Sequence, residues 1–300
     1  MKRRPPERDG FFNVAKPSGL TSRDVVNRVC RIVGSKRVGH AGTLDPLATG
    51  VLVVAVGKAT RLVEYVQAQR KTYRAGFLLG RTSKTDDVEG VITIREGVAF
   101  PSEGTIREAL RRFEGRILQT PPAFSAIKHQ GKRAYDLARS GAIVDLKPRL
   151  VEVFRITLEE YEAPRLRLEI ECGSGTYIRA IARDLGEAIG VGGLMESLER
   201  TAIGVFQLAD AVALNQLEQE DWRAILRPLL DGCAGLPMVN LNQEQARRFQ
   251  LGQGVTFDQA VIDQSTETAV VSTGTFLGIG SFNAATGSLR PLKGGFSESG

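Results

Sequence analysis

The segment 39–50 brings together residue types that could do chemistry. It holds three glycines, one histidine (His40) and one aspartate (Asp45), which comes directly before Pro46, and the apolar run 51–56 follows it. Glycines let a loop approach a ligand closely, and the proline biases Asp45 toward extended backbone. A carboxylate held on such a loop could act as a nucleophile that forms a covalent intermediate. An Asp-Pro pair is also a common turn former, and the residue types alone leave both interpretations open.

The residue content argues against metal and redox chemistry. The chain has three cysteines, which lie far apart and never form a C-x-x-C pair: Cys30, Cys172 and Cys233. That spacing is not typical of a disulfide framework or a thiolate zinc site, and two histidines are few for a His-based metal site. The glycine-rich segments 50–58 and 190–193 do not match the phosphate-binding and dinucleotide-binding motifs. We therefore expect no metal and no cofactor.

Positive charge is concentrated before residue 235. The first 234 residues carry 36 basic and 29 acidic side chains, a balance of +7, whereas the remainder carries −1. Within the first part, the segment 127–150 has six cations and two acids; the cations are Lys128, Lys132, Arg133, Arg139, Lys147 and Arg149. Such a segment could follow a phosphate backbone. It could equally be a solvated surface, since many soluble domains carry basic runs.

The elements that must position these residues alternate between strands and helices. Thr21 and Asp24 form a capping box pattern that begins a helix, which should stop at Gly34. Apolar periodicity predicts strands at 11–16, 51–56, 72–79 and 165–172 and helices at 105–114 and 176–189. The strand at 165–172 alternates between inward apolar and outward charged residues, which is typical of a sheet with one solvated face. We therefore predict an α+β fold in which a mixed or antiparallel sheet has helices packed against it.

A boundary between two domains is expected at 235–237, where glycine and proline interrupt the pattern. The first domain would span 1–234. The second, 235–300, would be a small β-rich module with short strands at 269–271 and 276–279. The chain has no apolar run of membrane-spanning length, and no apolar segment of the kind found in a signal peptide follows its basic start. We therefore expect a cytoplasmic protein.

An ordered set of motifs closely resembles the RNA pseudouridine synthases, and specifically the bacterial tRNA pseudouridine-55 synthase family, which isomerises a uridine in the T-loop of tRNA. The matching segments are 16–22, 39–50, 71–73 with 79–80, 86–90, 120–128 with 131–135, and 172–179. Together they extend over about residues 11 to 206. The C-terminal module is similar, more weakly, to a PUA RNA-binding domain. One difference is Glu199, which stands where the family usually has a second arginine; it weakens the case for a phosphate contact there and leaves the chemistry unaffected.

The resemblance implies the roles of the central site residues. Asp45 would be the nucleophile, with attack at C1′ of the ribose or at C6 of the base both open. Arg179 would be the cation beside it, because burial without such a partner protonates a carboxylate. Tyr73 would stack on the target base and assist removal of the C5 proton. From periodicity and residue type alone, Arg179 could instead be a solvated helix residue and Tyr73 a half-buried strand aromatic.

The remaining implied residues bind the substrate or support the site. Tyr177 and Leu198 would line the uracil pocket, and Lys16 would support the loop that carries Asp45. His40 would stack where the flipped uridine leaves its helix. A basic insertion at about 120–150 would grip the RNA, with Lys128, Lys132 and Arg133 as contact residues.

The implied substrate is the T-arm of tRNA, bound by a monomer that needs no cofactor, no membrane and no obligate protein partner. Two alternatives share the scaffold. One is a non-catalytic RNA-binding or tRNA-folding protein. The other is a guide-RNA-dependent pseudouridine synthase, against which the basic insertion argues.

Overall fold

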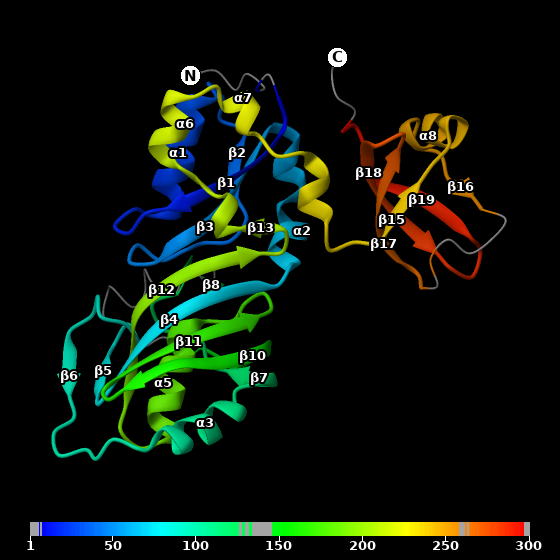
Figure 1. Ribbon diagram of the computed structural model, residues 1–300. Coiled ribbons are helices and arrows are strands. Elements are labelled where there is room, and N and C mark those ends of the chain that lie inside the picture. The colour runs from blue at the N-terminus through cyan, green and yellow to red at the C-terminus, as the bar shows by residue number, and fades with distance from the viewer. Residues whose placement is uncertain are drawn as a thin grey trace.

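The computed structural model describes residues 6, 8–125, 128–129, 132–133, 146–257, 262 and 264–296. A large mixed sheet occupies the first part of the chain, and a smaller sheet lies at the C-terminal end (Figure 1). The large sheet has the strand order β14-β1-β3-β12-β4-β11-β10-β7, with β2 added to β3 and β13 added to β12. These strands are β1 (Gly10–Lys16), β2 (Val38–His40), β3 (Thr49–Val56), β4 (Lys71–Leu79), β7 (Gly115–Gln119), β10 (Arg149–Glu162), β11 (Arg165–Cys172), β12 (Gly193–Ile203), β13 (Phe206–Gln207) and β14 (Val212–Ala213).

The predicted mixed sheet is confirmed by its pairing directions. Strand β4 is antiparallel to both β11 and β12, whereas β12 and β3 run parallel. Strand β11 alternates as predicted, because Leu166, Leu168, Ile170 and Cys172 are all buried. The parallel pairing of β12 with β3 places the start of β3, which directly follows the Asp45 loop, beside residues 199–200.

Helices cover this sheet: α1 (Ser22–Ile32), α2 (Val63–Ala68), α3 (Glu103–Arg111), α5 (Ile178–Ala188), α6 (Leu214–Gln219) and α7 (Trp222–Ile225). The capping box of α1 is present: the Thr21 hydroxyl accepts a hydrogen bond from the Asp24 backbone N–H, and the Asp24 carboxylate accepts one from the Thr21 backbone N–H. Helix α1 ends at Ile32 with Val33 as its C-cap, and Gly34, the predicted stop, follows with a φ of 65° that suits glycine. Helix α5 packs against β12 and β4 and so carries its N-terminus to the middle of the sheet.

Two of the predicted helices have different boundaries in the structure. Helix α3 begins before residue 105, because Ser102 is the N-cap and accepts from the Thr105 backbone N–H, and it ends at Arg111 rather than 114. Helix α5 begins at Ile178 rather than 176, because Tyr177 is its N-cap. In both cases apolar spacing identified the buried face, and the backbone conformation of the cap decided where the helix starts.

The C-terminal sheet has the order β15-β17-β18-β19-β16, with α8 (Gln243–Gln250) packed on it. Its strands are β15 (Met238–Asn240), β16 (Val255–Thr256), β17 (Thr266–Ser272), β18 (Thr275–Asn283) and β19 (Ser288–Lys293). The predicted short strands 269–271 and 276–279 lie within β17 and β18. Val271, Phe276 and Phe296 share one buried cluster with Leu62 and Val66 of the first part, so an apolar core joins the two sheets.

Smaller elements complete the described chain. Strands β5 (Arg81–Ser83) and β6 (Ile92–Ile94) pair as a hairpin, as do β8 (Lys128–His129) and β9 (Lys132–Arg133). Short 3₁₀ segments span Gly57–Leu62, Leu208–Asp210 and Leu229–Cys233. Within the described residues, no helix is long and apolar enough to cross a membrane.

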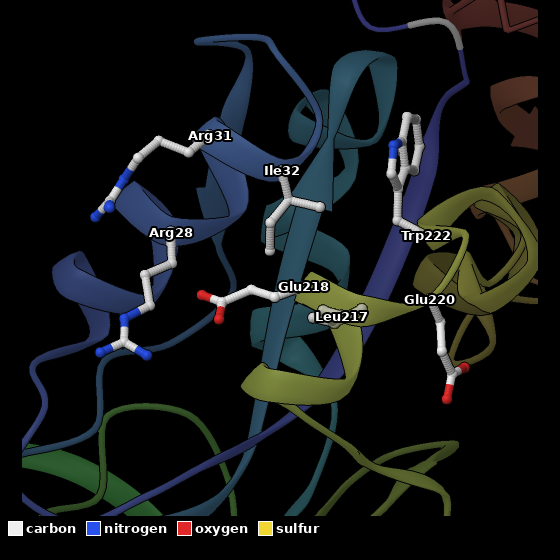
Figure 2. Close-up of a pocket in the computed structure, with 7 residues that line it drawn as sticks. All are labelled: Arg28, Arg31, Ile32, Leu217, Glu218, Glu220 and Trp222. Atoms are coloured by element: carbon white, nitrogen blue, oxygen red, sulfur yellow. The ribbon is translucent and has the colours of Figure 1, made fainter.

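A pocket of about 360 Å³ lies between α1 and the α6–α7 segment (Figure 2). Arg28 and Arg31 border it on the α1 side, and Glu218 and Glu220 border it on the other. Trp222 is buried at its edge, where its ring lies 6.2 Å from that of Phe12. None of the described residues predicted for the site lines this pocket, so the candidate site lies elsewhere.

Candidate active site

The loop that carries Asp45 is braced by the segment that follows β1. The buried ammonium of Lys16 donates three hydrogen bonds to backbone carbonyl oxygens, those of Pro17, Leu20 and Pro46, at 2.9, 2.6 and 3.3 Å. The Gly19 N–H also donates to Pro46 O, at 2.8 Å. Lys16 therefore ties the turn after β1 to the residue that directly follows Asp45.

Burial has an electrostatic consequence for Lys16. Its side chain is enclosed beneath the loop, and this desolvation lowers its pKa to about 8, although the nearby Asp45 acts in the opposite direction. Ser22 adds a second brace, since its hydroxyl accepts from the Leu44 N–H at 2.9 Å. The Lys16-to-Ser22 motif thus holds the loop through backbone atoms on both sides of Asp45.

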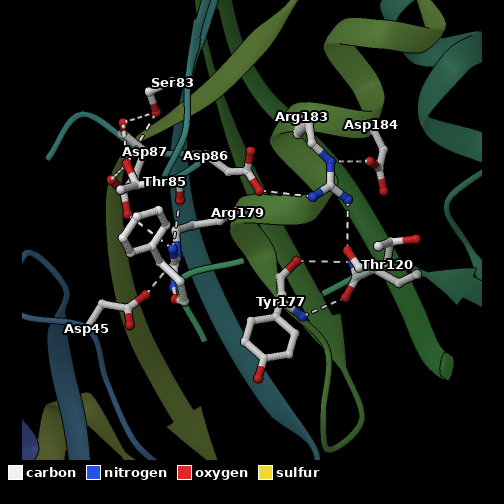
Figure 3. Close-up of polar contacts among 12 residues, drawn as sticks. Asp45, Ser83, Thr85, Asp86, Asp87, Thr120, Tyr177, Arg179, Arg183 and Asp184 are labelled. Carbon is white, nitrogen blue, oxygen red and sulfur yellow. Dashed lines mark hydrogen bonds and ion pairs between the residues drawn. The ribbon is translucent and has the colours of Figure 1, made fainter. Parts of the chain in front are cut away.

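Asp45 forms an ion pair with Arg179, the second residue of helix α5. The distance between Arg179 Nε and Asp45 Oδ2 is 3.0 Å (Figure 3). The arginine side chain is 7% exposed and the aspartate side chain 35% exposed. Arg179 is therefore not the solvated helix residue that periodicity allowed, and the carboxylate retains access to solvent.

The other guanidinium nitrogens of Arg179 are also bound. Nη1 donates to Thr85 O at 2.7 Å, and Nη2 donates to Phe124 O at 3.1 Å. Nη1 also lies 3.4 Å from Oδ2 of the buried Asp87. Because a guanidinium is planar and its donors are fixed in direction, these partners hold Nε toward Asp45.

Asp87 belongs to the acidic turn 86–90, a motif to which the sequence assigned no site residue. Its second carboxylate oxygen accepts from the Thr85 hydroxyl at 2.5 Å and from the Glu89 N–H at 3.0 Å. The turn docks on β12, where Met195 N donates to Asp86 O at 3.0 Å and Val88 N donates to Met195 O at 3.1 Å. An irregularity in the β12–β4 pairing between Met195 and Ser197 accompanies this docking.

Arg200 is a second residue that sequence reasoning missed. It is 1% exposed, and it donates from Nε to Val51 O at 2.7 Å and from Nη2 to Gly42 O at 3.1 Å. It thereby supports the Asp45 loop from inside the sheet. Gly50 makes this possible: its φ is 96°, and a Cβ there would lie 2.3 Å from Arg200 O. The available signal was the alternation along β12, which puts Arg200 on the same buried side as Leu198 and Ala202.

Tyr73 and Leu198 lie on neighbouring strands, β4 and β12. Both are nearly buried and share one apolar cluster with Leu44, the residue before Asp45. Tyr73 is in register with Arg200, and burial raises the pKa of its phenol, so the hydroxyl keeps its proton at neutral pH. The negative charge of Asp45 acts on this phenol in the same direction, so Tyr73 lies near Asp45, and Leu198 is on the neighbouring strand.

Tyr177 and His40, two further residues predicted for the site, are both half-buried. Tyr177 is half-buried at the N-terminus of α5, and burial raises the pKa of its phenol. His40 lies on β2, where burial lowers the pKa of its ring. Its Nδ1 is buried and has no hydrogen-bond partner among the described residues. A neutral, half-buried imidazole can stack on a base.

The predicted RNA-gripping insertion falls mostly outside the described residues. Backbone pairing is described for Lys128 and His129 with Arg133 and Lys132, in the hairpin of β8 and β9. The side chains of Lys128, Lys132 and Arg133 lie outside the described part of the chain, and their contact roles stay predictions.

Glu199, the difference from the resembled family, has a clear neighbour. It is directly opposite Arg74 in the β12–β4 register, and both side chains line a pocket of about 490 Å³ on the sheet. Opposite charges at facing positions of neighbouring strands are stabilising. The negative charge of Glu199 is therefore favourable opposite the positive charge of Arg74.

The fold has counterparts of known structure. A structure described as "Crystal Structure of a Cbf5-Nop10-Gar1 Complex" covers 98% of this chain and 87% of its own, with 25% identity and a TM-score of 0.75. An archaeal box H/ACA sRNP Nop10-Cbf5 complex shows the same fold at 24% identity and a TM-score of 0.72. The profile "TruB family pseudouridylate synthase (N terminal domain)" matches residues 30–178. The fold and the site thus define a pseudouridylate synthase, which is an isomerase.

Comparison with related sequences identifies the family within the pseudouridylate synthases. The profile "tRNA pseudouridylate synthase B C-terminal domain" matches residues 179–232, and "Pseudouridine synthase II TruB, C-terminal" matches 237–293. A tRNA pseudouridine synthase B of Dehalococcoides mccartyi is 44% identical over 87% of this chain and 88% of that protein. One of Gloeobacter violaceus is 43% identical over 95% of this chain and 98% of that protein. The chain belongs to the TruB family of pseudouridylate synthases, as its motifs predicted.

Proposed function

We propose that the protein converts one uridine of the tRNA T-loop, position 55, to pseudouridine, with Asp45 as the nucleophile. The observation that carries this proposal is the half-exposed carboxylate of Asp45 beside the buried Arg179 guanidinium, at 3.0 Å. Relatives named tRNA pseudouridine synthase B, 42–45% identical to this chain, support tRNA as the substrate.

The reaction is an isomerisation that needs little besides position and charge. The N1–C1′ glycosidic bond breaks, the base turns, C5 bonds to C1′, and the C5 proton leaves while N1 gains one. Asp45 holds the separated fragment through a covalent bond. Arg179 supplies a fixed positive charge where the carboxylate must stay ionised. No electrons are gained or lost, so the chain's own residues suffice.

The uridine must leave its stacked position in the loop before the site can enclose it. Tyr73 and Leu198 form the apolar side of the pocket, where the ring of Tyr73 stacks on the base and its protonated hydroxyl assists at C5. Tyr177 lines the other side. His40 occupies the space from which the base departs, and the insertion at about 120–150 binds the phosphates.

The substitution Asp45→Asn tests the assignment. It keeps the shape of the side chain and removes its charge. We expect loss of pseudouridine, measured by mass spectrometry of digested tRNA, with tRNA binding retained in a filter assay. Normal turnover by the variant would refute the role of Asp45. Loss of tRNA binding together with loss of activity would point to a folding defect instead.

We further propose that the protein acts alone, as a cytoplasmic monomer, on the T-arm. The relatives at 42–45% identity are named for tRNA, whereas the Cbf5 complexes, which hold further proteins, are 25% identical or less. Activity on an isolated T-arm stem-loop, without guide RNA or protein, is the test. A strict requirement for either would favour the guide-dependent alternative, and RNA refolding that persists in Asp45→Asn would reveal an additional folding role.

A further inference from the structure

The short segment 119–124, which leads into the basic insertion, is fastened across the start of helix α5. Gln119 is 2% exposed, and its amide makes two hydrogen bonds with the backbone of Tyr177. It accepts from Tyr177 N at 2.8 Å and donates to Tyr177 O at 3.0 Å. Tyr177 is the N-cap of α5, and its own side chain caps no backbone N–H. Gln119, on a distant strand, instead pairs with the backbone N–H of Tyr177, one of the N–H groups that the start of a helix leaves without a partner.

Arg183, one turn after Arg179 on α5, fastens the same segment from the other side. Its Nη2 donates to Thr120 O at 2.8 Å, and its Nη1 lies 2.9 Å from Asp86 Oδ2 (Figure 3). Its Nε pairs with Asp184 at 2.7 Å, which sets the plane of the guanidinium. One side chain thus joins the segment 119–124 to the acidic turn.

These two segments supply the partners of Arg179. Phe124 O belongs to the first segment, and Thr85 O and Asp87 belong to the acidic turn with its preceding residue. A shift of either segment would move an acceptor of the planar Arg179 guanidinium and turn Nε away from Asp45. Misplacement of a reacting group by about 1 Å can cost about a hundredfold in rate.

We propose that Gln119 and Arg183 are positioning residues for catalysis: they lock the root of the insertion and the acidic turn onto α5, and so aim Arg179 at Asp45. This inference rests on the proposed function, because it takes Asp45 and Arg179 as the reacting pair. It adds a physical link between the segment that leads to the RNA-gripping insertion and the chemistry.

Two variants test the link. Arg183→Lys keeps a positive charge but cannot bind Thr120 O, Asp86 and Asp184 together. Gln119→Glu keeps the acceptor for Tyr177 N and loses the donor to Tyr177 O. Arg165→Lys is the matched control, because Arg165 forms an exposed two-oxygen pair with Glu196 outside the site. Each variant is assayed for single-turnover rate with excess enzyme, tRNA affinity and melting temperature.

We expect Arg183→Lys and Gln119→Glu to slow the single-turnover rate by about tenfold or more, while tRNA affinity and melting temperature stay close to those of Arg165→Lys. A full rate in both variants would overturn the positioning role, and so would a loss of rate that only follows a loss of melting temperature. Asp45→Asn is assayed in the same experiment, so that failure of the positioning role can be distinguished from failure of the proposed function. If Asp45→Asn is inactive and the positioning variants are fully active, the proposed function stands and this inference falls. If Asp45→Asn turns over normally, the proposed function falls.

Discussion

Arg179 and Asp45 form an asymmetric ion pair: the guanidinium is 7% exposed and the carboxylate 35% exposed, at 3.0 Å between Nε and Oδ2. The cation is fixed in advance by backbone oxygens of two other segments, so it needs no reorganisation when charge changes at Asp45. Of the two side chains, the carboxylate is the one that solvent reaches. This asymmetry supports the proposal that the carboxylate is the reacting group and the guanidinium its support.

Replacing Arg179 by lysine should separate charge from geometry. An ammonium keeps the positive charge, but it cannot reach Asp45, Thr85 O and Phe124 O at once. We expect the single-turnover rate to fall by about a hundredfold or more, with tRNA affinity changed far less. Rapid-quench kinetics with tritium release from C5-labelled tRNA would measure this. A rate within about threefold of the parent protein would contradict the requirement for a fork-shaped cation.

Arg200→Met tests the support beneath the loop. The thioether fills part of the space but leaves the carbonyl oxygens of the buried Val51 and the half-buried Gly42 without these donors. The expected loss in the free energy of unfolding is about 1–3 kcal/mol, read from urea titration. Arg165→Met is the exposed control and should change stability by about 0.5 kcal/mol or less. Equal effects of the two substitutions would show that Arg200 is not a support.

Gly50→Ala examines the close approach of β3 and β12. Gly34 and Gly50 both have positive φ, 65° and 96°, but a Cβ at 34 meets nothing within 4 Å, whereas one at 50 would lie 2.3 Å from Arg200 O. Gly34→Ala should therefore show only the backbone strain, about 1 kcal/mol. Gly50→Ala should lower stability clearly more and slow the enzyme as well. Thermal melting and turnover are measured for both variants. Similar losses in Gly34→Ala and Gly50→Ala would contradict a close contact between Gly50 and Arg200 O.

Lys16 should impose an alkaline limit on activity. Its pKa in the folded protein is about 8 against 10.5 for a free lysine, so it loses its proton first in the folded state. Above pH 8 the amine has one donor fewer for its three carbonyl partners, and the Asp45 loop loosens. The rate should then fall with a midpoint near pH 8. The contribution of Lys16 to the free energy of unfolding changes in the opposite direction. Between pH 8 and 10.5 the unfolded chain holds more protons than the folded chain, so this contribution rises with pH.

Lys71 provides the control for that pH profile. Burial also lowers its pKa to about 8, but its ammonium donates to Gln67 O and Gln69 O, away from the Asp45 loop. Lys71→Met should keep the alkaline fall in rate, whereas Lys16→Met should be slow at every pH and show no such midpoint. An unchanged alkaline fall in Lys16→Met would assign the limit to another group.

Local patterns in the sequence were enough to predict the elements and the central loop. The capping box at Thr21, the alternation along β11 and the apolar run of β3 are short-range signals, and each appears in the structure as predicted. The motif set likewise predicted the family and the pairing of Arg179 with Asp45. The limits of α3 were missed because its cap, Ser102, lies outside the apolar stripe.

Only the tertiary structure revealed the residues that hold the Asp45 loop and Arg179 in position. Arg200 binds Val51, 149 residues earlier, Arg183 binds the Asp86 turn, 97 residues earlier, and Gln119 caps a helix 58 residues later. Short-range spacing gives no information on such partners, because an arginine or glutamine on one face of an element is compatible with solvent or with burial. Which of the two occurs depends on the carbonyl oxygens that a distant segment brings there. The amino-acid sequence by itself determined the family and the residues that we propose for the chemistry, and the packing of distant backbone decided how these residues are held.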